Sequence, residues 1–208
     1  MVRIEQILTP EINQLLSEFS NLGGVLDFKI FKITGPYISI EAHVTTARHT
    51  LELLKQDNDK YFDDLSKSLG TDRDMYFKID NKHVLADSGT LITPSQFFGH
   101  YHDIKSQGNL TNFINNNSDF TTQGYTYAFL NPPYSFGKTQ MTDQEIERYF
   151  INFNQFMFND ISKLTIYSWL TDCSNYFEAG NEWWGSFFWT VYNPEKDWFI
   201  GIAASTTD

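Results

Sequence analysis

The sequence has a single cysteine, Cys173, among 208 residues. One cysteine cannot form an intrachain disulfide, and it cannot make a zinc site without other kinds of ligand. No apolar run approaches the roughly 18–20 residues that a membrane-spanning helix needs. The first residues also lack the apolar core and the cleavage site of a secretory signal. These absences predict a protein of a reducing cytoplasm with no membrane partner.

Basic residues are scarce relative to acidic ones. The chain has 15 lysines and arginines against 26 aspartates and glutamates, which gives a formal net charge of -11. Binding to a phosphate backbone needs clustered positive charge, so the composition argues against a nucleic-acid partner. A negative field instead speeds the encounter with a basic protein, such as a toxin. The alternative is that the acidity serves only solubility.

Aromatic residues are abundant. They make up 17% of the chain, with 19 Phe, 11 Tyr and 5 Trp. A buried aromatic side chain removes a large apolar area from water, so these residues are expected to dominate the core. A chain of this length can bury such a core without disulfides or metal ions.

Helix-starting sequences occur at three places. Thr9-Pro10 and Thr93-Pro94 each combine an N-cap threonine with a proline in the first turn. Gln96 lies where it completes a capping box with Thr93, and Thr142–Glu145 forms a second capping box. Apolar residues recur at helical spacing after each of them. Residues 47–69 predict a further helix that is heavily charged.

Alternating and fully apolar segments predict strands. The expected hairpins join 26–30 to 38–44, 75–77 to 83–85, and 187–192 to 198–204, and the segments 125–130 and 164–170 are expected to be single strands. The third hairpin is apolar on both faces, so it is expected at the centre of the sheet. The chain therefore predicts one α+β domain over residues 1–208, with a mostly antiparallel sheet built on a central aromatic-rich hairpin and flanked by three or four helices. The polar stretch 106–124 is either a long surface loop or a seam within the domain.

One short motif is typical of an enzyme. Asn131-Pro132-Pro133-Tyr134 follows an apolar segment and resembles the motif of amino-methyltransferases that act on adenine or on glutamine side chains. The resemblance implies that Asn131 holds the target amine and that Tyr134 stacks on the target. It also implies a doubly wound α/β sheet with a glycine-rich cofactor loop, but the sequence contains no two glycines separated by one residue. The alternative is a proline-rich turn.

A second candidate for chemistry is His100-Tyr101-His102-Asp103. Two histidines separated by one residue share a face on a strand and could bind a metal ion or serve a hydrolase, whereas on a helix they diverge. Thr93-Pro94 predicts a helix here, so a structural or surface role for His100, His102 and Asp103 is favoured. The sequence predicts no cofactor.

Two acidic segments are candidates for binding a protein. Glu178, Glu182, Trp183 and Trp184 combine carboxylates with large aromatic groups, which is the composition of a binding hot spot. Neighbouring tryptophans on a strand point to opposite sides, so only one is easily buried; burial statistics nevertheless favour the alternative that both pack. The second segment lies in the charged helix, at Asp57, Asp59, Asp63 and Asp64.

Two classes of function remain open. The composition is similar to that of small bacterial immunity or antitoxin proteins, which are acidic, cytoplasmic and non-catalytic, and it predicts occlusion of a basic partner. The alternative is an enzyme, either similar to amino-methyltransferases at residues 131–134 or hydrolytic at residues 100–103.

Overall fold

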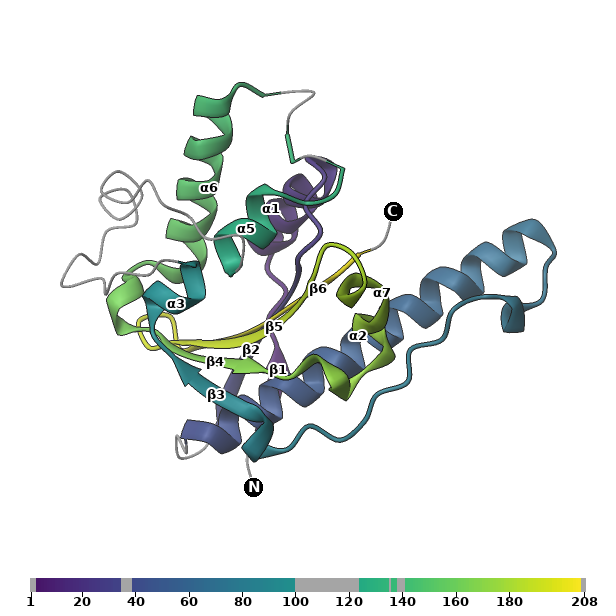
Figure 1. Cartoon of the computed structure of the whole chain (residues 1–208), viewed down its shortest axis with the longest axis horizontal. Coiled ribbons are helices and arrows are strands. Elements are labelled where there is room, and N and C mark those ends of the chain that lie inside the picture. The colour runs from purple at the N-terminus through teal and green to yellow at the C-terminus, as the bar shows by residue number, and fades with distance from the viewer. Residues whose placement is uncertain (1–2, 35–38, 100–123, 135, 138–140, 207–208) are drawn as a thin grey trace.

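A computed structural model describes residues 3–34, 39–99, 124–134, 136–137 and 141–206. Its centre is one six-stranded antiparallel sheet, with helices on both faces (Figure 1). The α+β fold with a mostly antiparallel sheet is thus confirmed. The strands are β1 (Arg3–Gln6), β2 (Asp27–Thr34), β3 (Gly89–Ile92), β4 (Thr165–Trp169), β5 (Ser186–Asn193) and β6 (Trp198–Ser205), in the spatial order β1-β2-β6-β5-β4-β3.

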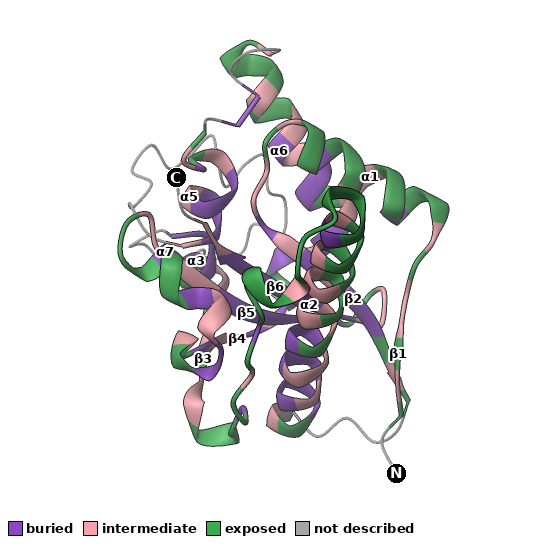
Figure 2. Ribbon diagram, turned by 90° about the vertical axis from the view of Figure 1, so that its right-hand side faces the viewer, coloured by how far each residue is buried: buried purple, intermediate pink, exposed green. Residues whose placement is uncertain are grey.

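The helices divide between the two faces of this sheet. Helices α1 (Pro10–Asn21), α3 (Pro94–Phe98), α5 (Tyr125–Leu130) and α6 (Asp143–Phe158) cover one face, and α2 (Ser39–Leu69) crosses the other (Figures 1 and 2). Short helix α7 (Glu178–Asn181) precedes β5. The predicted capping boxes form at Thr93 and Thr142, where each threonine side chain accepts from the backbone N–H three residues later.

The central hairpin is β5–β6, as its apolar pattern predicts. Both strands pair along their whole length, from Ser186 with Ser205 to Asn193 with Trp198. The side chain of Asn193 holds the turn, because its oxygen accepts from the backbone N–H groups of Glu195 and Lys196. Its amide nitrogen donates to two carbonyls at the end of α6, so the turn is also tied to that helix.

The face covered by α1, α3, α5 and α6 holds most of the aromatic core. Phe19, Phe129 and Phe153 lie within 5.3 Å of one another, measured between ring centroids. Tyr125 stacks on Phe97 at 4.6 Å and donates a hydrogen bond to buried Asn154 at 2.6 Å. The aromatic residues therefore fill the space between this face of the sheet and its helices.

The opposite face is covered by α2, whose buried positions are partly polar. His43, Thr46 and Thr50 are fully buried. The two threonine hydroxyls donate to carbonyls one turn earlier in the helix, so neither needs a partner outside it. Because these side chains are small or hydrogen-bonded within the core, α2 lies close to the strands.

Four predicted strands are wrong. The segment predicted over 38–44 is helical from Ser39, where α2 begins, and β2 pairs with β1 and β6 instead. Residues 125–130 form helix α5. Residues 75–77 and 83–85 form no hairpin. Asn81, which lies between these two segments, forms an isolated bridge with Ser174.

Gly201 sets how closely α2 can approach β6. A Cβ atom built on Gly201 would lie 1.8 Å from Oγ1 of Thr50. We therefore expect Gly201→Ala to lower the free energy of unfolding by about 2–3 kcal/mol, measured by urea denaturation. Thr50→Ala alone serves as the control, and combining the two changes should cost less than the sum of the separate losses. Strict additivity would contradict the proposed close contact.

Candidate functional site

Two segments that are far apart in the sequence meet beyond one end of the sheet. The indole N–H of Trp184 donates to the backbone carbonyl of Asn131 at 2.7 Å. The same ring stacks on Tyr127 and meets Phe187 edge to face. The turn after α5 and the turn before β5 therefore form one surface. We call it the aromatic surface and define it by Asn131, Tyr134, Glu178, Glu182 and Trp183.

Large aromatic side chains are exposed on this surface. Trp183 is 57% exposed and Tyr134 is 65% exposed, whereas Trp184 is half-buried. The alternative in which both tryptophans pack is therefore wrong for Trp183. The physical reason is that the pair lies in a turn, where the hydrogen bond and ring contacts of Trp184 direct Trp183 away from the protein.

The backbone beneath Trp183 is tightly held. The N–H of Gly180 donates to Oγ of Ser205 at 3.1 Å, and the N–H of Gly185 donates to the carbonyl of Gly180 at 2.7 Å. A Cβ atom on Gly180 would lie 2.5 Å from the carbonyl oxygen of Gly185, so only glycine fits there. The turn that presents Trp183 is thus fixed to the end of β6.

Glu178 and Glu182 give the aromatic surface its charge. Both residues are exposed, and neither forms an ion pair with any part of the chain that the structure describes. Their negative charges are therefore available to a partner.

The predicted acidic segment of α2 is different, because most of its charge is already paired. Asp57 binds the amine of Lys29 at 2.6 Å, and Arg73 binds both Asp59 and Asp63, at 2.8 and 2.9 Å. Only Asp64 of the four predicted aspartates has no ion pair among the described residues. Asp57 lies beside β2, and beyond it this end of α2 projects past the sheet and α7 (Figure 1).

The structural context of the Asn131–Tyr134 motif differs from that of the enzymes it resembles. Asn131 ends a helix rather than a strand, and its side chain is exposed. The strands that the structure describes pair only in antiparallel fashion, whereas the resemblance implies a doubly wound α/β sheet. The motif therefore forms a turn here, and the backbone carbonyl of Asn131 accepts a hydrogen bond from Trp184.

The second candidate for chemistry lies outside the part of the chain that the structure describes. His100, His102 and Asp103 lie outside the described residues, as does most of the stretch 106–124. Within the described ranges, no group of three or more His, Cys, Asp or Glu side chains could hold a metal ion. Burial raises the pKa of Cys173 to about 11, so its thiol stays protonated at neutral pH.

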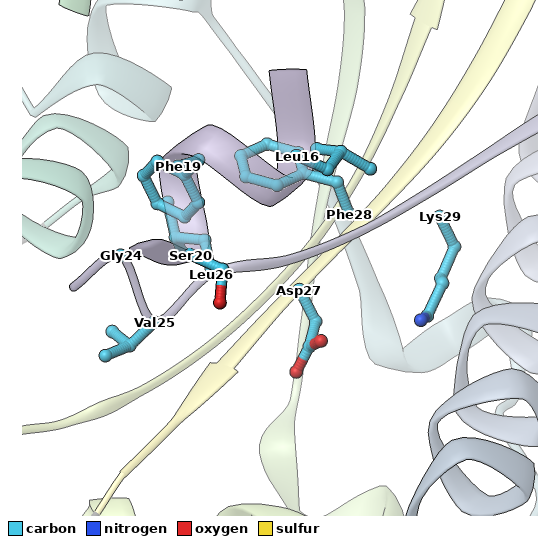
Figure 3. A pocket seen from close by; sticks show the side chains of 9 residues that line it. All are labelled: Leu16, Phe19, Ser20, Gly24, Val25, Leu26, Asp27, Phe28 and Lys29. Atoms are coloured by element: carbon cyan, nitrogen blue, oxygen red, sulfur yellow. The ribbon is translucent and has the colours of Figure 1, made fainter. Parts of the chain in front are cut away.

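A pocket that sequence reasoning missed lies along β2 (Figure 3). It measures about 360 Å³ and is lined by Leu16, Phe19 and Ser20 of α1 and by residues 24–29. Asp27 and Lys29 point to one side of β2 and Phe28 to the other (Figure 3). The hydroxyl of Tyr176 donates to Asp27 at 2.8 Å, and burial raises the pKa of this carboxyl against the opposing effect of Lys29. The alternation of charged and aromatic residues at 27–29 is the signal that could have found it.

Comparison with protein-family models and with curated proteins finds no match to this chain. Across the described helices, none is both long and apolar enough to cross a membrane.

The two adjacent tryptophans should differ in their effect on stability. Trp184→Ala removes a hydrogen bond and two ring contacts and should lower the free energy of unfolding by about 2–3 kcal/mol. Trp183→Ala removes an exposed side chain and should change it by less than about 0.5 kcal/mol. Urea denaturation measures both, and equal losses would contradict the arrangement described.

Buried His43 should make the stability of the folded chain sensitive to acid. Burial lowers its pKa from 6.5 to about 3, against a smaller opposing effect of hydrogen bonding at Thr190. The unfolded chain binds the proton that the folded chain refuses, so stability falls as the pH drops from 6.5 towards 3. The loss attributable to His43 should approach about 1.4 kcal/mol for each pH unit in this window.

The measurement is urea denaturation of the wild type and of His43→Gln across that pH range. The difference between the two proteins isolates His43 from the carboxyl groups, which titrate in both. If the two stability profiles run parallel, the buried neutral histidine is not the cause.

Proposed function

We propose that this chain is a non-catalytic binding protein that covers a basic partner protein with its aromatic surface, in the manner of immunity and antitoxin proteins. The observation that carries the proposal is the exposure of Trp183 and Tyr134 on two turns that Trp184 joins through its hydrogen bond to Asn131. Large aromatic side chains on a pre-ordered backbone bind a partner with little loss of conformational entropy.

The charge of the chain supports a basic partner. The net charge of -11 attracts such a partner from a distance, and the free carboxylates of Glu178 and Glu182 lie one turn apart in the segment that leads to Trp183. Rim charges of this kind raise the association rate and its dependence on salt, while the buried aromatic contact slows dissociation. We therefore assign Trp183 and Tyr134 the main share of the affinity and the two glutamates the steering.

The acidic half of α2 has a smaller role in this proposal. Because Lys29 and Arg73 pair with Asp57, Asp59 and Asp63, these carboxylates offer a partner less free charge. Asp64 adds to the general negative field from outside the aromatic surface.

The test is capture of a partner from a lysate of the native host, followed by titration of the purified partner. Trp183→Ala should weaken its binding at least about tenfold. Tyr61→Ala is the matched control, because Tyr61 is an aromatic residue of α2 with 62% exposure. Equal affinity for wild type and Trp183→Ala would overturn the proposed surface.

The electrostatic part has its own measurement. Glu178→Gln combined with Glu182→Gln should slow association and flatten the dependence of its rate on salt, with a smaller effect on dissociation. If the association rate of the captured partner does not change with salt concentration, steering by charge is contradicted, even if Trp183 proves to be essential.

A further inference from the structure

Strand β2 is longer than the strand that covers its outer side. Strand β1 pairs only with Phe31–Thr34, whereas the opposite side of β2 pairs with β6 from Asp27 onwards. Among the described residues, no strand lies beside the first half of β2. A sheet edge of this kind leaves backbone donors and acceptors that can pair with another chain.

The hydrogen-bond alternation shows which groups face outward. The carbonyl of Ile30 accepts from the N–H of Ile7, so Ile30 faces the β1 side. In an antiparallel ladder the N–H and C=O groups of alternate residues face the same side, so those of Phe28 also face outward. An extended chain continues this alternation to Leu26, one residue before the ladder begins at Asp27. No backbone hydrogen bond beyond the β2–β6 ladder is found for either residue within the described ranges.

The pocket in Figure 3 lies along this open edge. Leu26 and Phe28 line it, as do Leu16, Phe19 and Ser20 of α1. The side chains of Leu26 and Phe28 are buried in the core, so their backbone is the part that the pocket can offer to a ligand. The edge therefore has a wall formed by α1, and it has unpaired peptide groups.

The other wall carries an excess of negative charge. Asp27 and Lys29 point to the α2 side of β2, where Lys29 binds Asp57 and Asp27 accepts from Tyr176. The carboxyl groups of Asp27 and Asp57 thus lie near the single amine of Lys29. A strand added here would place alternate side chains against the apolar wall at Leu16 and against these carboxylates.

We propose that the open edge of β2 binds an extended peptide segment by strand addition, and that the segment alternates apolar residues with lysine or arginine. Backbone hydrogen bonds to Leu26 and Phe28 supply affinity, and the two walls select the side chains. None of the residues that line this pocket belongs to the aromatic surface, so the proposal stands whether or not that surface binds a partner.

The probe is a short synthetic peptide of alternating valine and lysine with blocked ends, titrated against the full chain and followed by NMR. We expect saturation to slow hydrogen exchange at the Phe28 amide by at least about tenfold. The Lys29 amide, which faces β6, should change little. The same peptide with N-methyl groups on its pairing amides should lose measurable binding.

Ser20→Trp fills the α1 wall without touching the core and should weaken the peptide at least about tenfold. Ser17→Trp is the matched control, since Ser17 is exposed on α1 but does not line the pocket. Trp183→Ala should leave the affinity unchanged. The proposal is overturned by absence of binding up to about 1 mM, by equal binding of the N-methylated peptide, or by equal effects of the two serine changes.

Discussion

The central constraint of this structure is that the β5–β6 hairpin must be covered on both faces. Val191, Ile200 and Ile202 are fully buried on one side, and Phe188 and Ala203 are buried on the other. Neither strand could face water without a large loss of apolar burial. This requirement explains why helices lie on both faces of this sheet. Antiparallel sheets more often leave one face exposed to water. It also explains why α2 approaches so closely at Gly201.

Because helices cover both faces of the sheet, the proposed sites lie at its ends and along its open edge. The turn at one end of the hairpin is occupied by Asn193 and its bonds to α6. At the other end, the chain returns from α7 into β5 and exposes Trp183 while Trp184 reaches back to Asn131. The loop after α5 is tied to the same region, because the N–H of Gly137 donates to the carbonyl of Leu22 just before β2. The aromatic surface and the approach to the open edge are therefore supported by the same connections.

The fold class, the central hairpin and the capped helices could be predicted because their patterns are strong and local. The start of α2 could not, because His43, Thr46 and Thr50 occupy core positions, and their polarity hides the helical period. The period-two alternation of Ile38, Ile40, Ala42 and Val44 then favoured a strand. Helix α5 has only six residues, too few for its apolar side chains to show a period. The meeting of Trp184 with Asn131 joins residues 53 positions apart, and no local pattern indicates it. The pairing of Asp59 and Asp63 with Arg73 was missed because charge counting ignores where the cations lie.

The single thiol of the chain has a practical consequence. Cys173 is buried against α2 and the sheet, beside the bridge between Asn81 and Ser174 that holds the segment after β4 in place. Its side chain is 7% exposed at the base of a pocket beside His83 and Leu170, so we expect labelling by a bulky thiol reagent to require movement of that segment. The rate of labelling in the native state therefore reports the frequency of this local opening, with no competing cysteine to confuse the signal. The labelling rate of Cys173 is therefore a measure of local opening on the α2 side of the sheet.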